Sequence, residues 1–175
     1  MTDPYRIGFA RPTDVHVLRD IELASARLLE GYAPESVLAE ATSLADLRQA
    51  EHERLLWVAL HGDSPVGFAH LRLLEPNAVH LQELDVHPDH GRRGIGTRLV
   101  NAVCGWAEAS GHGAVTLTTF RDVPWNMPFY ARLGFEEIPA ESMGPALRSI
   151  LDLEIRSGLD GARRVAMRWR AHVPR

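Results

Sequence analysis

A strand that runs into a glycine turn and then into a helix is the feature that most limits how this chain folds. In residues 78–86, AVHLQELDV, the apolar side chains before Gln82 have the opposite parity to those after Glu83. Side chains of a strand alternate between its two faces, so this change of parity predicts a β-bulge near Gln82 and Glu83. A strand that is buried on both faces is the alternative interpretation.

The turn after this strand, HPDHGRRGIG at residues 87–96, combines glycines with two arginines. Apolar residues then recur at helical spacing from Ile95, which predicts a helix that ends at the SGHG of residues 110–113. A strand, turn and helix in this order direct free backbone N–H groups and the positive end of a helix dipole at one point. The segment therefore predicts an anion site for a ligand that carries phosphates. A tight turn with solvated arginines is the alternative.

Strand and helix signals alternate along the chain without a repeat, a low-complexity tract or a linker. With 175 residues, of which 45% are hydrophobic, they predict a single mixed α/β domain over residues 1–175. Strands are expected at 5–12, 54–62, 65–75, 78–86, 114–120, 135–139 and 163–171, and helices at 13–30, 43–53, 95–109, 124–134 and 144–158.

The first helix and the last strand carry the most specific local predictions. The helix is expected to begin after Thr13 or Asp14 and to bury a stripe made of Val17, Ile21, Ala24 and Leu28. Ser43 and Asp46 have capping-box spacing at the start of the second helix. The last strand is expected to close the sheet with one buried face, made of Val165, Met167 and Trp169.

Composition excludes several functional classes. A net charge of −4 and a pI near 6.1 give no general attraction for nucleic acid or for an anionic membrane. All 19 basic residues are arginine, so the chain lacks the lysine of a Walker phosphate loop. The spacing also differs from the dinucleotide fingerprint G-x-G-x-x-G, because no third glycine follows Gly96 at three residues.

Histidines and carboxylates form no compact metal-ligand set, even where His80 precedes Glu83 by three residues, so we expect no metal. The single cysteine, Cys104, lies in an apolar helical pattern and is expected to be a small buried hydrophobe. The N-terminal sequence lacks a signal-peptide profile, and the longest apolar run is too short to cross a bilayer. We therefore expect a cytoplasmic protein.

Two segments resemble the GNAT superfamily of acyl-CoA-dependent N-acetyltransferases. LDVHPDHGRRGIGTRLV, at residues 84–100, is similar to the strand and pyrophosphate loop of that family, R/Q-x-x-G-x-G/A, with Gly94 and Gly96 at the two small positions. WNMPFYARLGF, at residues 125–135, resembles its later helix with an asparagine and a tyrosine. The Arg or Gln of the family falls on Gly91 here, and Arg92 or Arg93 is expected to replace its side chain. The resemblance implies a twisted, mostly antiparallel sheet of about six to seven strands flanked by helices, with a splayed, bulged fourth strand.

The resemblance also implies a role for individual residues. Acetyl-CoA is the implied cofactor, with its pantetheine arm on the backbone of Leu84, Asp85 and Val86. Its pyrophosphate is expected on the turn formed by Arg92, Arg93, Gly94, Ile95, Gly96 and Thr97.

Three side chains complete the implied site. Asn126 is expected to contact the cofactor, although it also suits a helix cap. Glu83 is the expected general base, and a solvent-facing carboxylate is the alternative. Tyr130 is the expected general acid, and a buried aromatic under the sheet is the alternative.

The expected function is transfer of an acetyl group from acetyl-CoA to a primary amine by direct attack in a ternary complex. The acceptor is expected to be a small molecule or a peptide. It is expected to be selected by residues 28–36, by the strand at 135–139 and by the late helix, where Tyr32 and several carboxylates line a pocket. A non-catalytic acyl-CoA-binding sensor or module is the alternative. It would keep Gly94 and Gly96 without needing Glu83 or Tyr130. We expect a monomer or a homodimer that binds neither nucleic acid nor membrane.

Overall fold

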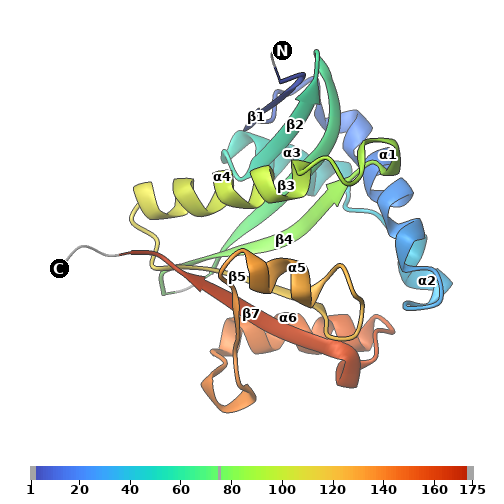
Figure 1. Ribbon diagram of the computed structural model, residues 1–175. Helices are drawn as coiled ribbons and strands as arrows, with labels where there is room; N and C mark the ends of the chain where they lie inside the picture. The colour runs from blue at the N-terminus through green and yellow to red at the C-terminus, as the bar shows by residue number, and fades with distance from the viewer. Residues whose placement is uncertain (1–2, 75, 173–175) are drawn as a thin grey trace.

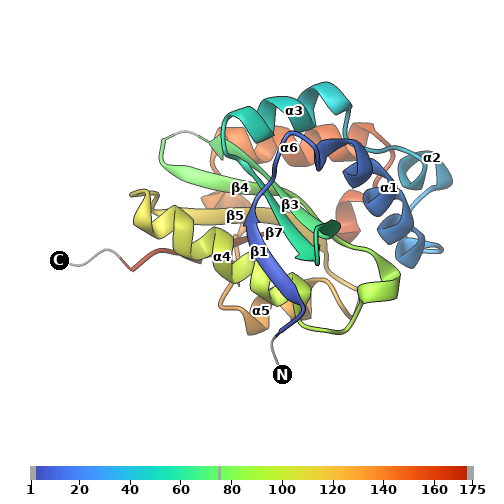
Figure 2. The ribbon, with the colours of Figure 1, turned by 90° about the horizontal axis from the view of Figure 1, so that it is seen from above.

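The computed structural model describes residues 3–74 and 76–172. It forms one seven-stranded sheet in the order β1-β2-β3-β4-β5-β7-β6, with helices on both faces (Figures 1 and 2). The strands are β1 (Tyr5–Phe9), β2 (Leu56–His61), β3 (Ser64–Leu74), β4 (Ala78–Val86), β5 (Ala114–Phe120), β6 (Glu136–Glu137) and β7 (Arg164–Arg170). The helices are α1 (Val15–Ala26), α2 (Glu35–Leu38), α3 (Leu44–His52), α4 (Ile95–Ala109), α5 (Met127–Arg132) and α6 (Pro145–Arg156), with 3₁₀ turns η1 (Arg27–Leu29), η2 (Pro88–His90), η3 (Ala140–Ser142) and η4 (Gly161–Arg163).

Every neighbouring pair of strands is antiparallel except β4 and β5, which are parallel. This confirms the mixed α/β class and the mostly antiparallel sheet. Helices α4 and α5 cover one face, whereas α1, α3 and α6 cover the other (Figure 2). Most buried apolar residues form one core, and a small second cluster of Ile138, Leu147 and Ala166 lies beneath α6.

The predicted bulge in β4 is confirmed. Glu83 pairs with His70 on β3, but the next pair is Leu81 with Leu71, so Gln82 has no partner on that strand. An extra residue reverses the alternation of side chains, which is why the apolar parity changes there. The alternative interpretation also holds for the first half of β4, where three consecutive residues are buried: Val79, His80 and Leu81.

The two halves of the sheet separate beside the bulge. The parallel ladder joins Ala78–Leu81 of β4 to Ala114–Leu117 of β5 and ends there. Beyond Leu81, β4 continues along β3 while β5 continues along β7. The splayed fourth strand is therefore confirmed, and it produces an unpaired strand edge in the middle of the molecule.

The predicted stripe of α1 is confirmed for Ile21, which is buried, and for Val17, which packs against the core, but it is wrong for Leu28. The buried apolar residues are Val15, Leu18 and Ile21, and Leu28 is 51% exposed. The α-helix ends at Ala26 and a 3₁₀ turn follows, so helical spacing no longer sets the direction of Leu28. The Ser43 cap of α3 is confirmed, because its hydroxyl accepts a hydrogen bond from the Asp46 N–H at 3.0 Å.

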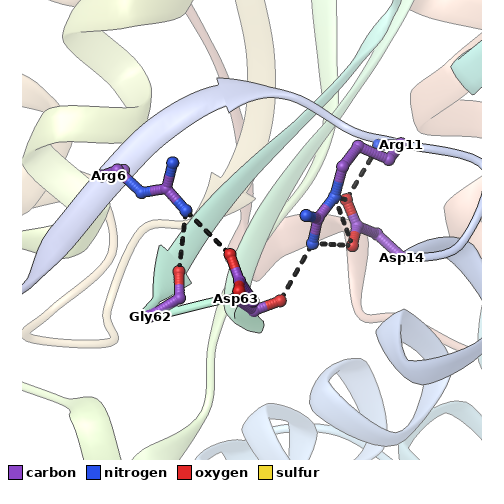
Figure 3. Close-up of polar contacts among 5 residues, drawn as sticks. All are labelled: Arg6, Arg11, Asp14, Gly62 and Asp63. Atoms are coloured by element: carbon purple, nitrogen blue, oxygen red, sulfur yellow. Dashed lines mark hydrogen bonds and ion pairs between the residues drawn. The ribbon is translucent and has the colours of Figure 1, made fainter.

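Asp14 precedes α1 but does not cap it with its side chain. Its carboxylate instead accepts hydrogen bonds from Arg11, the shortest being 2.7 Å from Nη2 to Oδ1 (Figure 3). Arg11 also donates to the carbonyl of Asp63, whose carboxylate pairs with Arg6 at 3.1 Å (Figure 3). The network joins the entry of α1 to the turn between β2 and β3, so the buried Asp14 carboxylate serves tertiary structure.

The last strand does not close the sheet, which corrects the prediction. β7 lies between β5 and β6, and its residues Val165, Ala166 and Met167 are all buried. α6 covers the face that alternation predicted to be exposed, and Ala166 packs there against Leu147. β6 forms this edge of the sheet and is only two residues long. The short helix α2 lies between residues 30 and 43, where no helix was predicted.

Candidate active site

The free edge of β4 is the first component of the site. In the described part of the chain, no strand lies on the β5 side of residues 82–86. Leu84, Asp85 and Val86 are held in register by Ala69, Phe68 and Gly67 of β3, respectively. Because peptide groups of a strand point alternately to its two sides, this segment offers backbone donors and acceptors into the splay.

The turn before α4 is the second component. Among the described residues, none accepts a hydrogen bond from the backbone N–H groups of residues 92–97. Gly94 has a φ of 74°, a left-handed conformation that suits glycine, and Arg92 adopts a φ of 56° beside it. The turn therefore directs several free amides and the dipole of a 15-residue helix to one place.

A single open cleft of about 2150 Å³ joins these two components. Ordinary small-molecule sites enclose roughly 300–1,000 Å³, so this cleft has room for a large ligand together with a second one. Arg93 is exposed and lies outside the lining. Every other catalytic or cofactor-binding residue predicted from the sequence lines the cleft: Glu83, Leu84, Asp85, Val86, Arg92, Gly94, Ile95, Gly96, Thr97, Asn126 and Tyr130.

Two carboxyl groups lie side by side on the bulged half of β4. Burial raises the pKa of Glu83 well above its ordinary value, and the charges of Asp85 and Glu22 raise it further. Burial likewise raises the pKa of Asp85 to about 7, with Glu22 as the next cause and the Ser25 hydroxyl opposing it. Both shifts are in the direction that a general base requires.

Tyr130 of α5 faces the same carboxylates. Burial raises the pKa of its phenol, and the charges of Asp85 and Glu83 add to this effect. Its ring packs against Phe129 and Phe135, with centroids 5.0 Å and 5.7 Å away. The hydroxyl has no hydrogen-bond partner within residues 3–74 and 76–172, so a packed ring and an available proton donor coexist in one residue.

Asn126 occupies the N-cap position of α5, but its side chain makes no capping hydrogen bond. Its backbone carbonyl instead accepts from the N–H groups of Phe129 and Tyr130 at 2.9 Å and 3.2 Å. The amide side chain therefore lines the cleft and does not cap the helix.

The family model described as the acetyltransferase (GNAT) family matches residues 21–135, which include β4, the glycine turn and α5. The chain belongs to the GNAT acetyltransferase family. Solved structures agree with this membership. The fold is similar to that of PaiA N-acetyltransferase from Thermoplasma acidophilum in complex with coenzyme A, with a TM-score of 0.74 at 16% identity over 95% of this chain and 98% of that one.

Two further GNAT neighbours cover almost the whole chain. The ribosomal-protein-S18-alanine N-acetyltransferase of Escherichia coli has a TM-score of 0.69 at 18% identity, over 98% of this chain and 96% of that one. Rv2747 from Mycobacterium tuberculosis, in complex with CoA and NLQ, has a TM-score of 0.68 at 25% identity, over 94% and 98%. The GNAT fold and its CoA-bound neighbours support acyl transfer from acetyl-CoA as the general chemistry of the cleft.

The structure explains why this GNAT protein has glycine at residue 91. The turn η2 brings the carbonyl oxygen of Pro88 to 3.1 Å from the place where a Cβ on Gly91 would lie. That distance is tighter than ordinary van der Waals contact, so a longer residue would force the turn to move. Of the two neighbouring arginines, only Arg92 lines the cleft.

Several polar residues around the carboxyl pair were not identified from the sequence. Glu22 of α1 accepts hydrogen bonds from the N–H and hydroxyl of Thr42, each at 3.0 Å. Glu154 of α6 pairs with Arg164 of β7 at 3.1 Å. These residues are far from β4 in the sequence, and only the packing of α1 and α6 over the splay brings them together (Figure 2).

The position of the Asp85 side chain beside Glu83 was not predicted, although the sequence was sufficient to predict it. Asp85 follows Glu83 by two residues beyond the bulge, so both side chains share one face of the strand. Tyr32, which was expected to line the acceptor pocket, does not line the cleft. Its ring packs edge-on against Trp125 with centroids 5.7 Å apart, and Trp125 lines the cleft instead.

The described residues contain no cluster of three or more His, Cys, Asp or Glu side chains arranged to hold a metal ion. His80 lies on the core side of the bulge, where its Nδ1 is 3.0 Å from the Thr116 hydroxyl. Within the same described ranges, no helix has the length and apolar character needed to span a membrane.

Proposed function

We propose that this protein transfers the acetyl group of acetyl-CoA to a primary amine by direct attack within a ternary complex. One observation carries the proposal: Glu83 and Tyr130 line the same cleft as the unpaired edge of β4 and the free amides of α4. A binding module needs only the edge and the amides. Direct transfer needs a base, an acid and both substrates in one space. The cleft contains the two candidate side chains and has room for two ligands.

The residues fit the cofactor. The amides of residues 92–97 and the Arg92 guanidinium suit a pyrophosphate, and Asn126 has a free amide side chain beside them. The open edge at residues 84–86 suits the amides of a pantetheine arm, which pair with a strand edge as another strand would. When bound, acetyl-CoA supplies a thioester as the acyl donor.

Glu83 then removes a proton from the acceptor ammonium, directly or through water. An amine with a pKa near 10 is almost fully protonated at neutral pH, and only the neutral form has a lone pair for attack. The raised pKa of Glu83 makes it a stronger base than an exposed carboxylate. A backbone N–H of β4 beyond the bulge stabilises the negative charge that develops on the carbonyl oxygen.

Tyr130 donates its phenolic proton to the departing thiolate, whose conjugate acid has a pKa near 8.5. Burial and the neighbouring carboxylates raise the pKa of Tyr130, so its hydroxyl is protonated throughout the physiological range. The ring is fixed by Phe129 and Phe135, which orients the hydroxyl without a hydrogen bond to the protein.

The deciding experiment measures release of free CoA from acetyl-CoA in the presence of amines, peptides, polyamines and aminoglycosides. We expect acceptor-dependent release and a ternary kinetic pattern, with intersecting rather than parallel lines. Tight CoA binding without turnover across the whole panel would support the sensor alternative and contradict the proposal.

Replacing Tyr130 by Phe removes the proton donor and keeps the ring. We expect kcat to fall about 100-fold, because general acid catalysis commonly contributes that much, while the thermal stability stays within about 0.5 kcal/mol of wild type. Tyr32→Phe makes the same chemical change outside the cleft lining and is the matched control. Equal kcat values for Tyr130→Phe and wild type would exclude Tyr130 as the general acid and show that it contributes only to packing.

A further inference from the structure

Several exposed large apolar side chains line the cleft, and we call them the apolar rim. Five large apolar side chains are exposed in residues 3–74 and 76–172, and four of them line the cleft. They are Leu28 at 51% exposure, Leu73 at 56%, Trp125 at 47% and Leu153 at 56%, and Ile155 is the one outside the lining. Exposed apolar groups gathered at a cavity mark a binding surface rather than chance exposure.

The floor beneath this rim is acidic. Asp85 is only 9% exposed, and its Oδ2 has no hydrogen-bond partner among the described residues. Glu83 lies two residues away on the same face of β4. A buried carboxylate oxygen without a partner is costly, so this oxygen is prepared for a ligand that donates hydrogen bonds.

The nearest cation to the floor is already paired within the protein. Arg164 is bonded to Glu154 and also donates to the Thr118 hydroxyl. Glu22, which is hydrogen-bonded to Thr42, adds a further carboxyl group near the floor. The chain has no lysine. The other guanidinium groups in the lining lie elsewhere, on β3, in the α4 turn and at the last residue of α5: Arg72, Arg92 and Arg132. The floor therefore presents two carboxylates to the ammonium group of a ligand. Among the described residues, it presents no unpaired cation to a carboxylate group of a ligand.

We propose that the acceptor is a primary amine carried on an apolar body, such as an arylalkylamine, with no carboxylate next to the amino group. Glu83 and Asp85 bind the ammonium, and Leu28, Trp125 and Leu153 contact the apolar body. This inference rests on the proposed transfer function and specifies its substrate. In the reaction the amine nitrogen bonds to the acyl carbon as the carbon–sulfur bond breaks, Glu83 takes the ammonium proton, and Tyr130 protonates the thiolate.

Other amines fit less well for stated reasons. The carboxylate of an amino acid would lie beside Asp85, and like charges in a desolvated site cost several kcal/mol. The second ammonium of a diamine would lie against the side chains of Leu28, Trp125 and Leu153, which contribute no carboxylate to pair with it.

Matched pairs of acceptors test the inference. Tyramine and tyrosine differ only in the carboxylate, and tyrosinamide restores the bulk of that group without its charge. We expect kcat/KM for tyramine to exceed that for tyrosine at least about 100-fold, with tyrosinamide closer to tyramine. Hexylamine should likewise exceed 1,6-diaminohexane. Asp85→Asn should narrow the ratio of tyramine to tyrosine, because it removes one of the repelling charges.

Two variants on α6 test the rim. Leu153→Ala should raise KM for tyramine about 10-fold with little change in kcat, whereas Ile155→Ala is the matched control outside the lining. Both positions are exposed, so neither substitution threatens folding. Equal KM values for the two variants would remove the rim from acceptor binding.

Calorimetric binding of tyramine and tyrosine to the CoA complex separates the two proposals. Turnover that favours tyrosine would overturn the acceptor class and leave the transfer function intact. Preferential binding of tyramine without turnover of any amine would overturn the transfer function.

Discussion

At the scale of single residues, Gln82 determines which side chains of β4 reach the site, because it pairs with no residue of β3. Its insertion places Glu83 and Asp85 on the side of β4 where Glu22 of α1 raises the pKa of both carboxyl groups. Without it, these carboxyl groups would exchange faces with Leu84 and Val86. The charge of Asp85 raises the pKa of Glu83, and the charge of Glu22 raises the pKa of both groups.

Glu83→Gln tests the base through its pH profile. Since burial raises the pKa of Glu83, its basic form increases over a higher pH range than that of an exposed carboxylate, and kcat/KM of wild type should rise with it. The variant should lack this rise and be slower by about 100-fold near pH 7, with a smaller deficit as the pH approaches the pKa of the amine near 10. An identical pH profile for wild type and variant would exclude Glu83 as the base.

Asp85→Asn has a consequence for stability as well. The folded-state pKa of about 7 lies above the ordinary value of 3.8, so ionisation of Asp85 opposes folding. The stability linked to this group is complete below about pH 4 and is lost as the pH rises through about 7. The free energy of unfolding of wild type should therefore fall relative to that of Asp85→Asn between pH 5 and 8.

Urea denaturation at the two pH values measures this difference. Each pKa unit corresponds to about 1.4 kcal/mol, so the effect amounts to a few kcal/mol. Asp152→Asn, at an exposed position of α6, is the matched control. Parallel pH dependence for wild type and Asp85→Asn would show that Asp85 titrates alike in the folded and unfolded chains.

At the scale of elements, the strand, turn and helix at residues 78–109 were the most predictable part of the molecule. Their signals are local: a parity change for the bulge, glycines for the turn and a spacing of apolar residues for α4. The burial of Leu28 at the end of the α1 stripe and the single buried face of β7 were predicted wrongly. Both depend on partners distant in sequence, because the 3₁₀ turn after Ala26 and the cover of β7 by α6 arise from tertiary packing.

The same distinction holds for the candidate site. Residues within the strand–turn–helix unit and α5 were predicted, and they line one cleft apart from Arg93. Glu22, Glu154 and Trp125 were not predicted, since each reaches the cleft only through the packing of its own element.

Arg92→Ala and Arg93→Ala test the glycine turn. Arg92 lines the cleft and Arg93 does not, so we expect Arg92→Ala to weaken CoA binding about 10-fold and Arg93→Ala to have a smaller effect. The contribution of Arg92 should shrink at high salt, because the interaction is between charges. Calorimetry at two salt concentrations measures both effects, and an unchanged Kd for the double variant would show that the amides act without either side chain.

At the scale of the whole molecule, Cys104 reports on opening of the core. It is the single cysteine, lies on α4 against the sheet and is 6% exposed. Burial, with Glu108 as a second cause, raises the pKa of its thiol to about 12, so the reactive thiolate is scarce in the folded chain.

Iodoacetamide should therefore modify Cys104 only after the core opens. We expect labelling of the native protein to be at least about 100-fold slower than in urea, and slower still with desulfo-CoA, which has no thiol of its own. Intact mass measured over time follows the reaction. Labelling of the native protein at the rate of the unfolded chain would contradict the burial of Cys104.

The short ladder between β4 and β5 has a further consequence for how the protein responds to its ligand. Four residue pairs join the two halves of the sheet, and from Gln82 onward the amides of β4 that face the splay exchange with solvent unless a ligand bonds to them. A cofactor with amides in line along this edge acts as an additional strand. Under the proposed binding of the pantetheine arm, we expect hydrogen-exchange protection at residues 82–86 to increase when CoA is added, so that it measures occupancy of the site.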